Sequence, residues 1–177
     1  MSETVHNIEE KNAYLGQDFL TWLWFCSESN NGQIKDRHGQ EYLLYLEQKV
    51  TVQGGEGESK DTNVSNGQLS ELKEARMGLR SGKKVNQAKV KIEQDSEAWE
   101  MQLKAENFDF TGLKTPKVEM KVEEGEDPDS RFLEKMFLIE KSLEVIDDLY
   151  LYFLQKRLGP EWNQELSDMK KWIQSGE

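Results

Sequence analysis

One cysteine and two histidines in 177 residues leave this sequence little with which to hold a transition metal or to run nucleophilic catalysis. A tetrahedral zinc site needs a clustered set of nitrogen and sulfur ligands, which Cys26 and two histidines far apart in the sequence do not supply. Cys26 also lies in the apolar run 19–26, where we expect a buried and unreactive thiol. We therefore expect no disulfide within the chain, no metal and no cofactor.

The two histidines do not by themselves indicate an active site. His6 falls in a segment without apolar periodicity, and His38 falls in the turn at 35–39. A serine or cysteine triad would need one of them to lie beside a buried nucleophile. The sequence therefore predicts a protein that is not an enzyme and has no small-molecule substrate. An enzyme would require His38 to lie beside a carboxylate or hydroxyl in a cleft.

Membrane and export signals are also lacking. Residues 1–10 are acidic and do not show the basic and apolar regions of a signal peptide. The longest apolar run is well short of the roughly 20 residues that span a bilayer. We expect a cytoplasmic protein that makes no contact with a membrane.

Positive charge is scarce except in one block. The net charge is −11, which alone argues against nucleic acid because like charges repel. Residues 72–92, however, carry seven lysines and arginines against one acid, Glu74, whereas the rest of the chain carries 16 bases and 33 acids. The candidate phosphate-contacting residues in this basic block are Arg76, Arg80, Lys83, Lys84, Lys89 and Lys91.

Apolar periodicity predicts the elements of the first half of the chain. Residues 1–11 show no pattern and are expected to be a loose tail, whereas Leu15, Phe19 and Trp22 begin a helical stripe that predicts a helix over about 14–29. Two short strands are expected within 41–53, with a turn at 47–49. The remaining expectations here are a glycine-rich loop at 54–61, a capping box at 65–68 and a helix from Leu69 to Gly82.

Alternation of apolar and charged residues then predicts a hairpin, with strands at 88–93 and 99–104 and a turn at 94–96. Phe108 and Phe110 are expected to extend the sheet before Gly112 and Pro116 break it. An acidic connector at about 117–127 follows. Together these patterns predict an α+β fold in which a small antiparallel sheet packs against an aromatic-rich N-terminal helix and a long C-terminal helix, as a single domain over 12–177.

The long helix is expected over about 128–158, with Asp127 as its N-cap, Pro128 in its first turn and Gly159 as its stop. A terminal helix is expected at about 161–174. One stripe of the long helix is apolar for more than three heptads. This stripe packs either against the sheet and the first helix or against a second copy or another protein. The members of this candidate interface are Phe132, Met136, Ile139, Leu143, Ile146, Tyr150 and Phe153.

The basic block also has two interpretations. It is either an ordinary solvated face of a helix and a hairpin, or a row of cations that follows the phosphates of duplex DNA without reading bases. The block carries no aromatic side chain for base stacking, so a duplex fits it better than a single strand.

Several short motifs occur in an order that resembles the C-terminal half of the bacterial recombination-associated protein RdgC family, over about 15–158. They are LTW at 20–22, RSGKKV at 80–85, AKVKI at 88–92, WEMQL at 99–103 and FTGLK at 110–114. The resemblance implies a non-enzymatic, sequence-independent DNA-binding protein of the nucleoid that forms a homodimer and modulates recombination. It also implies that the cations of the basic block contact phosphates. The alternative is a protein interaction module or oligomerisation scaffold that does not bind DNA.

Overall fold

The computed structural model describes residues 2–53, 61–64, 69–119, 121, 125, 127 and 129–175, and side chains over most of them. The helices, in chain order, are α1 (Ser2–Glu28), a short 3-10 turn (Asn30–Gly32), α2 (Leu69–Arg80), α3 (Ser130–Leu158) and α4 (Trp162–Ser175). The strands are β1 (Gln33–Lys35), β2 (Glu41–Gln53), β3 (Asp61–Val64), β4 (Lys84–Gln94), β5 (Glu97–Lys104) and β6 (Phe110–Lys114).

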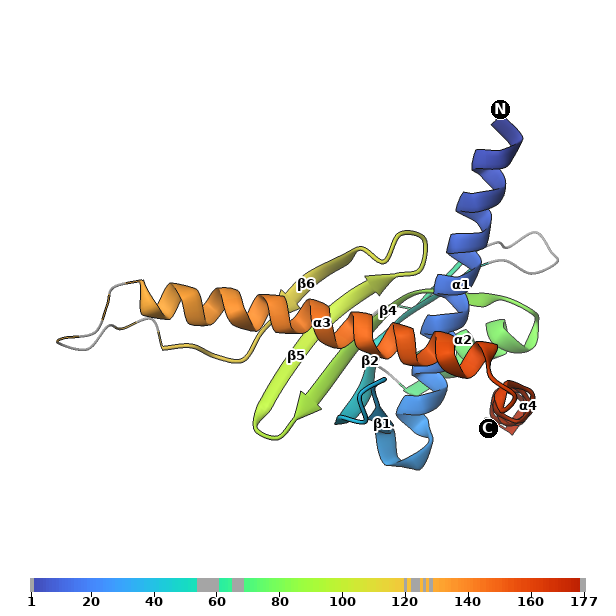
Figure 1. The fold of residues 1–177 in the computed structure, drawn as a ribbon. Coiled ribbons are helices and arrows are strands. Elements are labelled where there is room, and N and C mark those ends of the chain that lie inside the picture. The colour runs from blue at the N-terminus through green and yellow to red at the C-terminus, as the bar shows by residue number, and fades with distance from the viewer. Residues whose placement is uncertain are drawn as a thin grey trace.

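The six strands form one antiparallel sheet in the order β1-β2-β4-β5-β6, and β3 pairs with residues 50–53 at the end of β2. Figure 1 shows α1 and α3 crossing the same side of this sheet, with α4 at the end of α3. The α+β class and the N-terminal and C-terminal helices expected from the sequence are thereby confirmed. Among the described residues, no helix is both long and apolar enough to span a bilayer.

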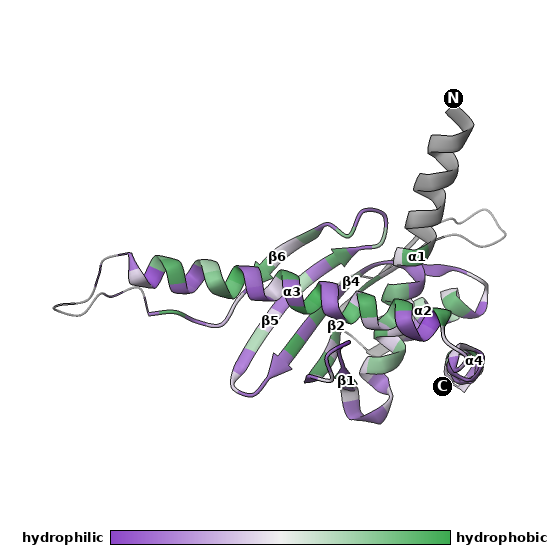
Figure 2. Ribbon diagram, viewed as in Figure 1, coloured by the Kyte–Doolittle hydropathy of each residue, from purple (hydrophilic) through white to green (hydrophobic). Residues whose placement is uncertain are grey.

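The core lies between the helices and one face of the sheet, because alternate strand residues point to that face. Val90, Ile92 and Trp99 are buried there, and the indole N–H of Trp99 donates to the backbone carbonyl of Leu138 in α3. Aromatic side chains of α1 and α3 complete the layer; the ring centroids of Phe19 and Phe153, for example, are 5.5 Å apart. Figure 2 shows hydrophobic residues alternating with hydrophilic ones along β4 and β5.

The structure of α1 corrects the prediction that residues 1–11 form a loose tail. The helix ends at Glu28, one residue from the expected end, but it begins at Ser2, so most of the segment 1–11 is helical rather than a loose tail. Figure 1 shows this first part of α1 extending beyond the sheet. The sequence gives no periodic apolar stripe there because these turns do not lie over the sheet.

The expected pair of strands at 41–53 is one strand, β2. Its pairing with β4 shifts by two residues between Glu47 and Val50, so the residues expected to form a turn form a bulge. A bulge bends a strand without ending it. The strands β1 and β3 were not expected from the sequence, and the glycine loop and capping box fall largely or wholly outside the described residues.

The hairpin is confirmed, with β4 and β5 joined by a two-residue turn at Asp95, whose φ is 53°. Phe110 begins β6 and Gly112 lies within it, so Gly112 does not break the sheet. Phe108 does not extend the sheet either: its φ is 54°, and its ring lies 4.7 Å from that of Tyr150. Phe108 is a partly buried aromatic residue packed against the core, and its apolar character alone did not distinguish it from a strand residue in the sequence.

The first residue of α3 and its N-cap differ from the prediction. The helix begins at Ser130 with Asp129 in the N-cap position, and the backbone carbonyl of Asp127 accepts a hydrogen bond from the Ser130 N–H. Its end at Leu158 and the following Gly159 cap agree with the sequence. In Figure 1 the first turns of α3 extend past the sheet on the side of β6. The sheet meets α3 from about Leu138, whose backbone carbonyl accepts the Trp99 indole N–H, so only the first turns have no sheet beneath them.

Candidate functional site

The basic block does not form one row in the structure. Lys89 and Lys91 alternate along β4 with the buried Val90, so they lie on the sheet face opposite the helices. Arg76 and Lys84 instead contact residues of α1 on the helical side. The shared patch on which a continuous phosphate track depends is therefore divided between two faces of the sheet.

On the open sheet face, both lysines lie among carboxylates. Lys89 forms an ion pair with Glu100 of β5, at 3.3 Å, and Lys91 forms one with Glu93. Lys114 of β6 contacts Glu100 as well, and the hydrogen bonds and charges of Lys114 and Lys89 lower the pKa of the Glu100 carboxyl relative to its ordinary value. The strand face thus carries alternating charge of both signs.

On the helical side, the cations join elements of the fold. Arg76 pairs with Glu28 and its guanidinium lies over the Trp172 ring, 5.1 Å from the centroid, so it links α2 to α1 and α4. Lys84 Nζ lies 2.9 Å from a carboxylate oxygen of Asp18. Arg80 donates to the backbone carbonyl of Ile173, and Lys83 lines a cleft beside α4. These contacts are structural links that the charge pattern alone does not reveal.

The candidate interface stripe on α3 is also divided. Its last members, Ile146 and Phe153, are buried in the core, and Tyr150 packs edge-on against Phe19 at 5.2 Å. Ile146 and Phe153 cannot meet a partner while the fold is intact, so the expectation that they form an interface is corrected, and Tyr150 is half-buried. Phe132, Met136 and Leu143 are exposed, and Ile139 is half-buried.

The exposed apolar surface of α3 is broader than that stripe. Phe132, Leu133 and Phe137 are 59%, 62% and 61% exposed, and Met136 lies among them. Leu133 and Phe137 are off the stripe and were not among the candidate interface residues. The clue to them in the sequence is that the first two turns of α3 are apolar on more than one side.

Acidic side chains continue the same side of α3. At about 100° per residue, Glu140, Glu144 and Asp147 project into the sector between Phe132 and Phe137, and all three are exposed. The neighbouring bases contact other groups: Lys141 pairs with Glu97 of β5, and Lys135 donates to the Thr115 hydroxyl. We call the group of Phe132, Leu133, Met136, Phe137, Glu140, Glu144 and Asp147 the α3 face.

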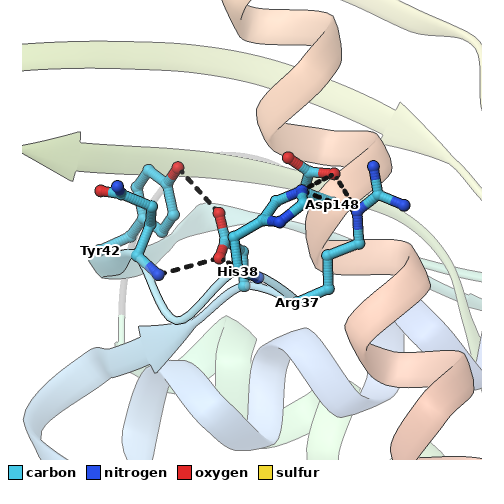
Figure 3. Close-up of polar contacts among 6 residues, drawn as sticks. Arg37, His38, Tyr42 and Asp148 are labelled. Atoms are coloured by element: carbon cyan, nitrogen blue, oxygen red, sulfur yellow. Dashed lines mark hydrogen bonds and ion pairs between the residues drawn. The ribbon is translucent and has the colours of Figure 1, made fainter.

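A polar cluster surrounds the turn between β1 and β2 (Figure 3). Asp36 is buried, and its carboxylate accepts hydrogen bonds from the backbone N–H groups of His38 and Gln40, at 2.8 and 2.9 Å, and from the Tyr42 hydroxyl, at 3.3 Å. Burial and the nearby Asp36 charge raise the pKa of Tyr42 to about 12. Asp36 therefore holds the turn in place.

His38 lies next to this turn, beside a carboxylate of α3. Its Nε2 atom is 3.6 Å from an Asp148 oxygen, and Arg37 donates to the same oxygen at 2.6 Å, as Figure 3 shows. Neither Arg37 nor Asp148 carries a hydroxyl or thiol, and His38 lines neither the cleft between α1, β1 and α3 nor the cleft beside α4. The arrangement fits a link between the turn and α3 better than a nucleophile and its base.

A cleft of about 340 Å³ lies between α1, β1 and α3. Its charged side chains are matched in pairs, Lys35 with Glu41 and Lys156 with Glu165, at 2.9 and 3.3 Å. Cys26 lines the same cleft, and burial, with Glu165 nearby, raises the pKa of its thiol above the ordinary range. No three His, Cys, Asp or Glu side chains gather as a metal site within the described part of the chain.

Comparison with known proteins gives no match to any family model, to any curated protein or to any solved structure. The resemblance to the RdgC family stays a prediction from the sequence.

Proposed function

We propose that this chain is a non-catalytic protein interaction module, and that its α3 face binds a basic amphipathic segment of a partner protein. The observation that carries the proposal is the exposure of Phe132, Leu133 and Phe137 on the part of α3 that extends past the sheet. Soluble proteins rarely leave several large apolar side chains together in water unless the surface binds something.

The size of the patch indicates the strength of the complex. A phenylalanine side chain has on the order of 200 Å² to bury, so Phe132 and Phe137 alone leave roughly 240 Å² in water at their exposed fractions. With Leu133 and Met136 the patch remains below the roughly 800 Å² that each partner contributes to a standard interface. We expect a transient complex of about micromolar affinity.

Charge supports a basic partner rather than a second copy. Glu140, Glu144 and Asp147 continue the apolar patch along the helix, in a chain of net charge −11. Two α3 faces placed together would bring these carboxylates close to one another, which raises the free energy of a homodimer. A helix with leucines on one side and lysines around them matches both parts of the surface, as in helix-in-groove recognition.

The test uses a synthetic helical peptide of about 18 residues, long enough to hold a helix, with leucines on one stripe and lysines elsewhere. Calorimetry on the full chain should give binding, and a peptide with glutamates in place of the lysines should bind at least about tenfold more weakly. The double variant Phe132→Ser/Phe137→Ser should also lose at least about tenfold in affinity, since aromatic anchors dominate interfaces.

A matched control is Leu158→Ser, which removes an apolar side chain that is 86% exposed at the other end of α3. This variant should bind the lysine peptide as the unchanged chain does. Equal affinity for the lysine and glutamate peptides, or an unchanged affinity in the double variant, would remove the proposal. A homodimer that dissociates in the double variant would replace the foreign partner by a second copy.

Duplex DNA is the second candidate partner, and one observation favours it. Arg80, Lys83 and Lys84 of the basic block are joined at the α4 end of the molecule by two bases from outside it, Arg157 and Lys170. About four phosphate contacts would give a slope near −3.6 in log K against log salt. A duplex titration at two salt concentrations tests this, and binding that Lys83→Glu/Lys84→Glu leaves unchanged would exclude it.

A further inference from the structure

The cleft of about 340 Å³ between α1, β1 and α3 is lined by both aromatic rings and charged side chains. The rings are those of Trp22 and Phe25 in α1 and Tyr152 in α3. Lys156 of α3 and Glu165 of α4 also line the cleft and form an ion pair at 3.3 Å. An apolar surface combined with a few placed polar groups is the common composition of a small-molecule site.

The fold holds the aromatic rings of this cleft in place. Trp22 and Tyr152 pack edge to face, with ring centroids 6.2 Å apart, and the Trp22 N–H donates to Glu165 at 2.8 Å. Phe25 packs edge to face against Trp172, at 5.8 Å. Because these rings need little ordering when a ligand arrives, the cleft is suited to binding a flat apolar group.

The charged lining of the cleft is balanced, with two lysines that each lie beside a glutamate. Lys35 and Glu41, 2.9 Å apart, are 59% and 74% exposed, whereas Lys156 and Glu165 are 24% and 22% exposed. Water screens exposed charges more than half-buried ones. We therefore expect the Lys156–Glu165 pair to decide which ligand charges the cleft accepts.

The Lys156–Glu165 pair favours a ligand that carries both signs of charge. The Lys156 ammonium group has three N–H donors, and a carboxylate can accept more than the two hydrogen bonds that Glu165 receives from Lys156 and Trp22. A ligand with one charge, paired with either residue, also lies close to the residue of its own sign and is repelled by it. A zwitterion with adjacent ammonium and carboxylate groups presents the opposite charge to both residues.

We propose that this cleft binds a free aromatic amino acid in its zwitterionic form. The α-carboxylate lies beside Lys156 and the α-ammonium group beside Glu165, where charge-assisted hydrogen bonds form. The ring lies against Phe25 and Tyr152, where its apolar surface leaves water. At about 30 Å³ per water-sized group, the cleft holds on the order of a dozen non-hydrogen atoms, the size of phenylalanine.

The test is a calorimetric titration of the full chain with phenylalanine. For a ligand of this size we expect a Kd of about 1 mM or lower. Phenethylamine lacks the carboxylate, phenylpropionate lacks the ammonium group, phenylpropanamide lacks both charges and alanine lacks the ring. Each of these four compounds should bind at least about tenfold more weakly than phenylalanine.

Cys26 gives a second measurement at the cleft itself, because it is the single cysteine of the chain and lines the cleft. Burial and the nearby Glu165 raise the pKa of its thiol, so its alkylation by iodoacetamide should be slow in the empty cleft. Phenylalanine at about ten times its Kd should slow this alkylation by about a further tenfold, because the reaction then requires an empty cleft. Alanine at the same concentration should leave the rate, followed by mass spectrometry, unchanged.

The double variant Lys156→Gln/Glu165→Gln removes both charges and keeps an acceptor for the Trp22 N–H, so it should bind phenylalanine at least about tenfold more weakly. The matched control is Asp168→Asn/Lys171→Gln, which removes an ion pair of α4 that does not line the cleft. This control should bind phenylalanine as the unchanged chain does. Circular dichroism of each variant checks that the fold is kept.

Three results would overturn the proposal. The first is no binding of phenylalanine at about 10 mM. The second is equal affinity for phenylalanine and any one of phenethylamine, phenylpropionate and phenylpropanamide, which would mean that the cleft does not select a zwitterion. The third is an unchanged affinity in a folded Lys156→Gln/Glu165→Gln variant.

Discussion

Phe132 and Phe153 lie on the same stripe of α3, yet Phe132 is 59% exposed and Phe153 is fully buried. The difference arises because the first turns of α3 extend past the sheet, whereas α3 contacts β5 at Leu138 and α1 at Phe153. Phe153 packs against Trp22 and Trp162, with ring centroids 5.5 and 5.8 Å apart. One stripe therefore serves the core at one end and is available for a partner at the other.

The two phenylalanines should respond differently to truncation. Phe153→Ala should lower the free energy of unfolding by about 3–5 kcal/mol, because it removes a ring from a packed core. Phe132→Ala should change it by less than about 0.5 kcal/mol, as for most exposed positions. Urea denaturation of both variants checks this. A large loss of stability in Phe132→Ala would mean that the first half of α3 is covered within the chain.

Gly16 should not tolerate alanine, although it lies inside α1. Glycine to alanine in a helix ordinarily stabilises a protein by about 1 kcal/mol. Here an added Cβ would overlap the carbonyl oxygen of Ala105, whose N–H is held by the Asn86 carbonyl at 2.8 Å. We expect Gly16→Ala to destabilise the fold by about 1–3 kcal/mol through overpacking.

A thermal melt measures the effect of Gly16→Ala, with Gln174→Ala at an exposed position of α4 as the control. The control should change the stability by less than about 0.5 kcal/mol. A stabilising Gly16→Ala would show that α1 does not cross so close to the end of β5.

Alkaline pH should reveal the environment of Tyr42. Its pKa is about 12 in the folded chain and about 10 in the unfolded chain. A raised folded pKa gives stability that is fully present below pH 10 and is lost as the pH rises towards 12. Tyr42→Phe lacks this titration, so urea midpoints measured at pH 8 and pH 11 should fall less in the variant. An equal decrease of the urea midpoint in the unchanged chain and in Tyr42→Phe would mean that the Tyr42 hydroxyl is not buried near Asp36.

Local patterns were enough to predict much of the fold. The hairpin follows from alternation between 88 and 104, and α3 follows from its repeated apolar stripe, because both patterns reflect contacts with one nearby surface. The strand β1 is only three residues long and gives no period. The bulge in β2 is set by its pairing with β4 and so could not be read from β2 alone.

The sites depended on tertiary contacts that a pattern does not contain. The basic block looked continuous in sequence, but Glu28 and Asp18 approach it from α1, far away along the chain, and Glu100 approaches it from the neighbouring strand β5. The cleft beside α4 likewise is lined by Lys83 together with Arg157 and Lys170, which are far away along the chain. Counting charged residues along a sequence gives the local excess of one sign of charge, but it does not show which side chains the fold brings next to them.

Hydrogen exchange of the full chain, with and without the lysine peptide, tests most directly the claim that the α3 face is the binding surface. We expect slower exchange of the amides in 131–144, which include most of the α3 face, and unchanged exchange at 84–91 in β4. Protection confined to 84–91, with none in 131–144, would contradict it.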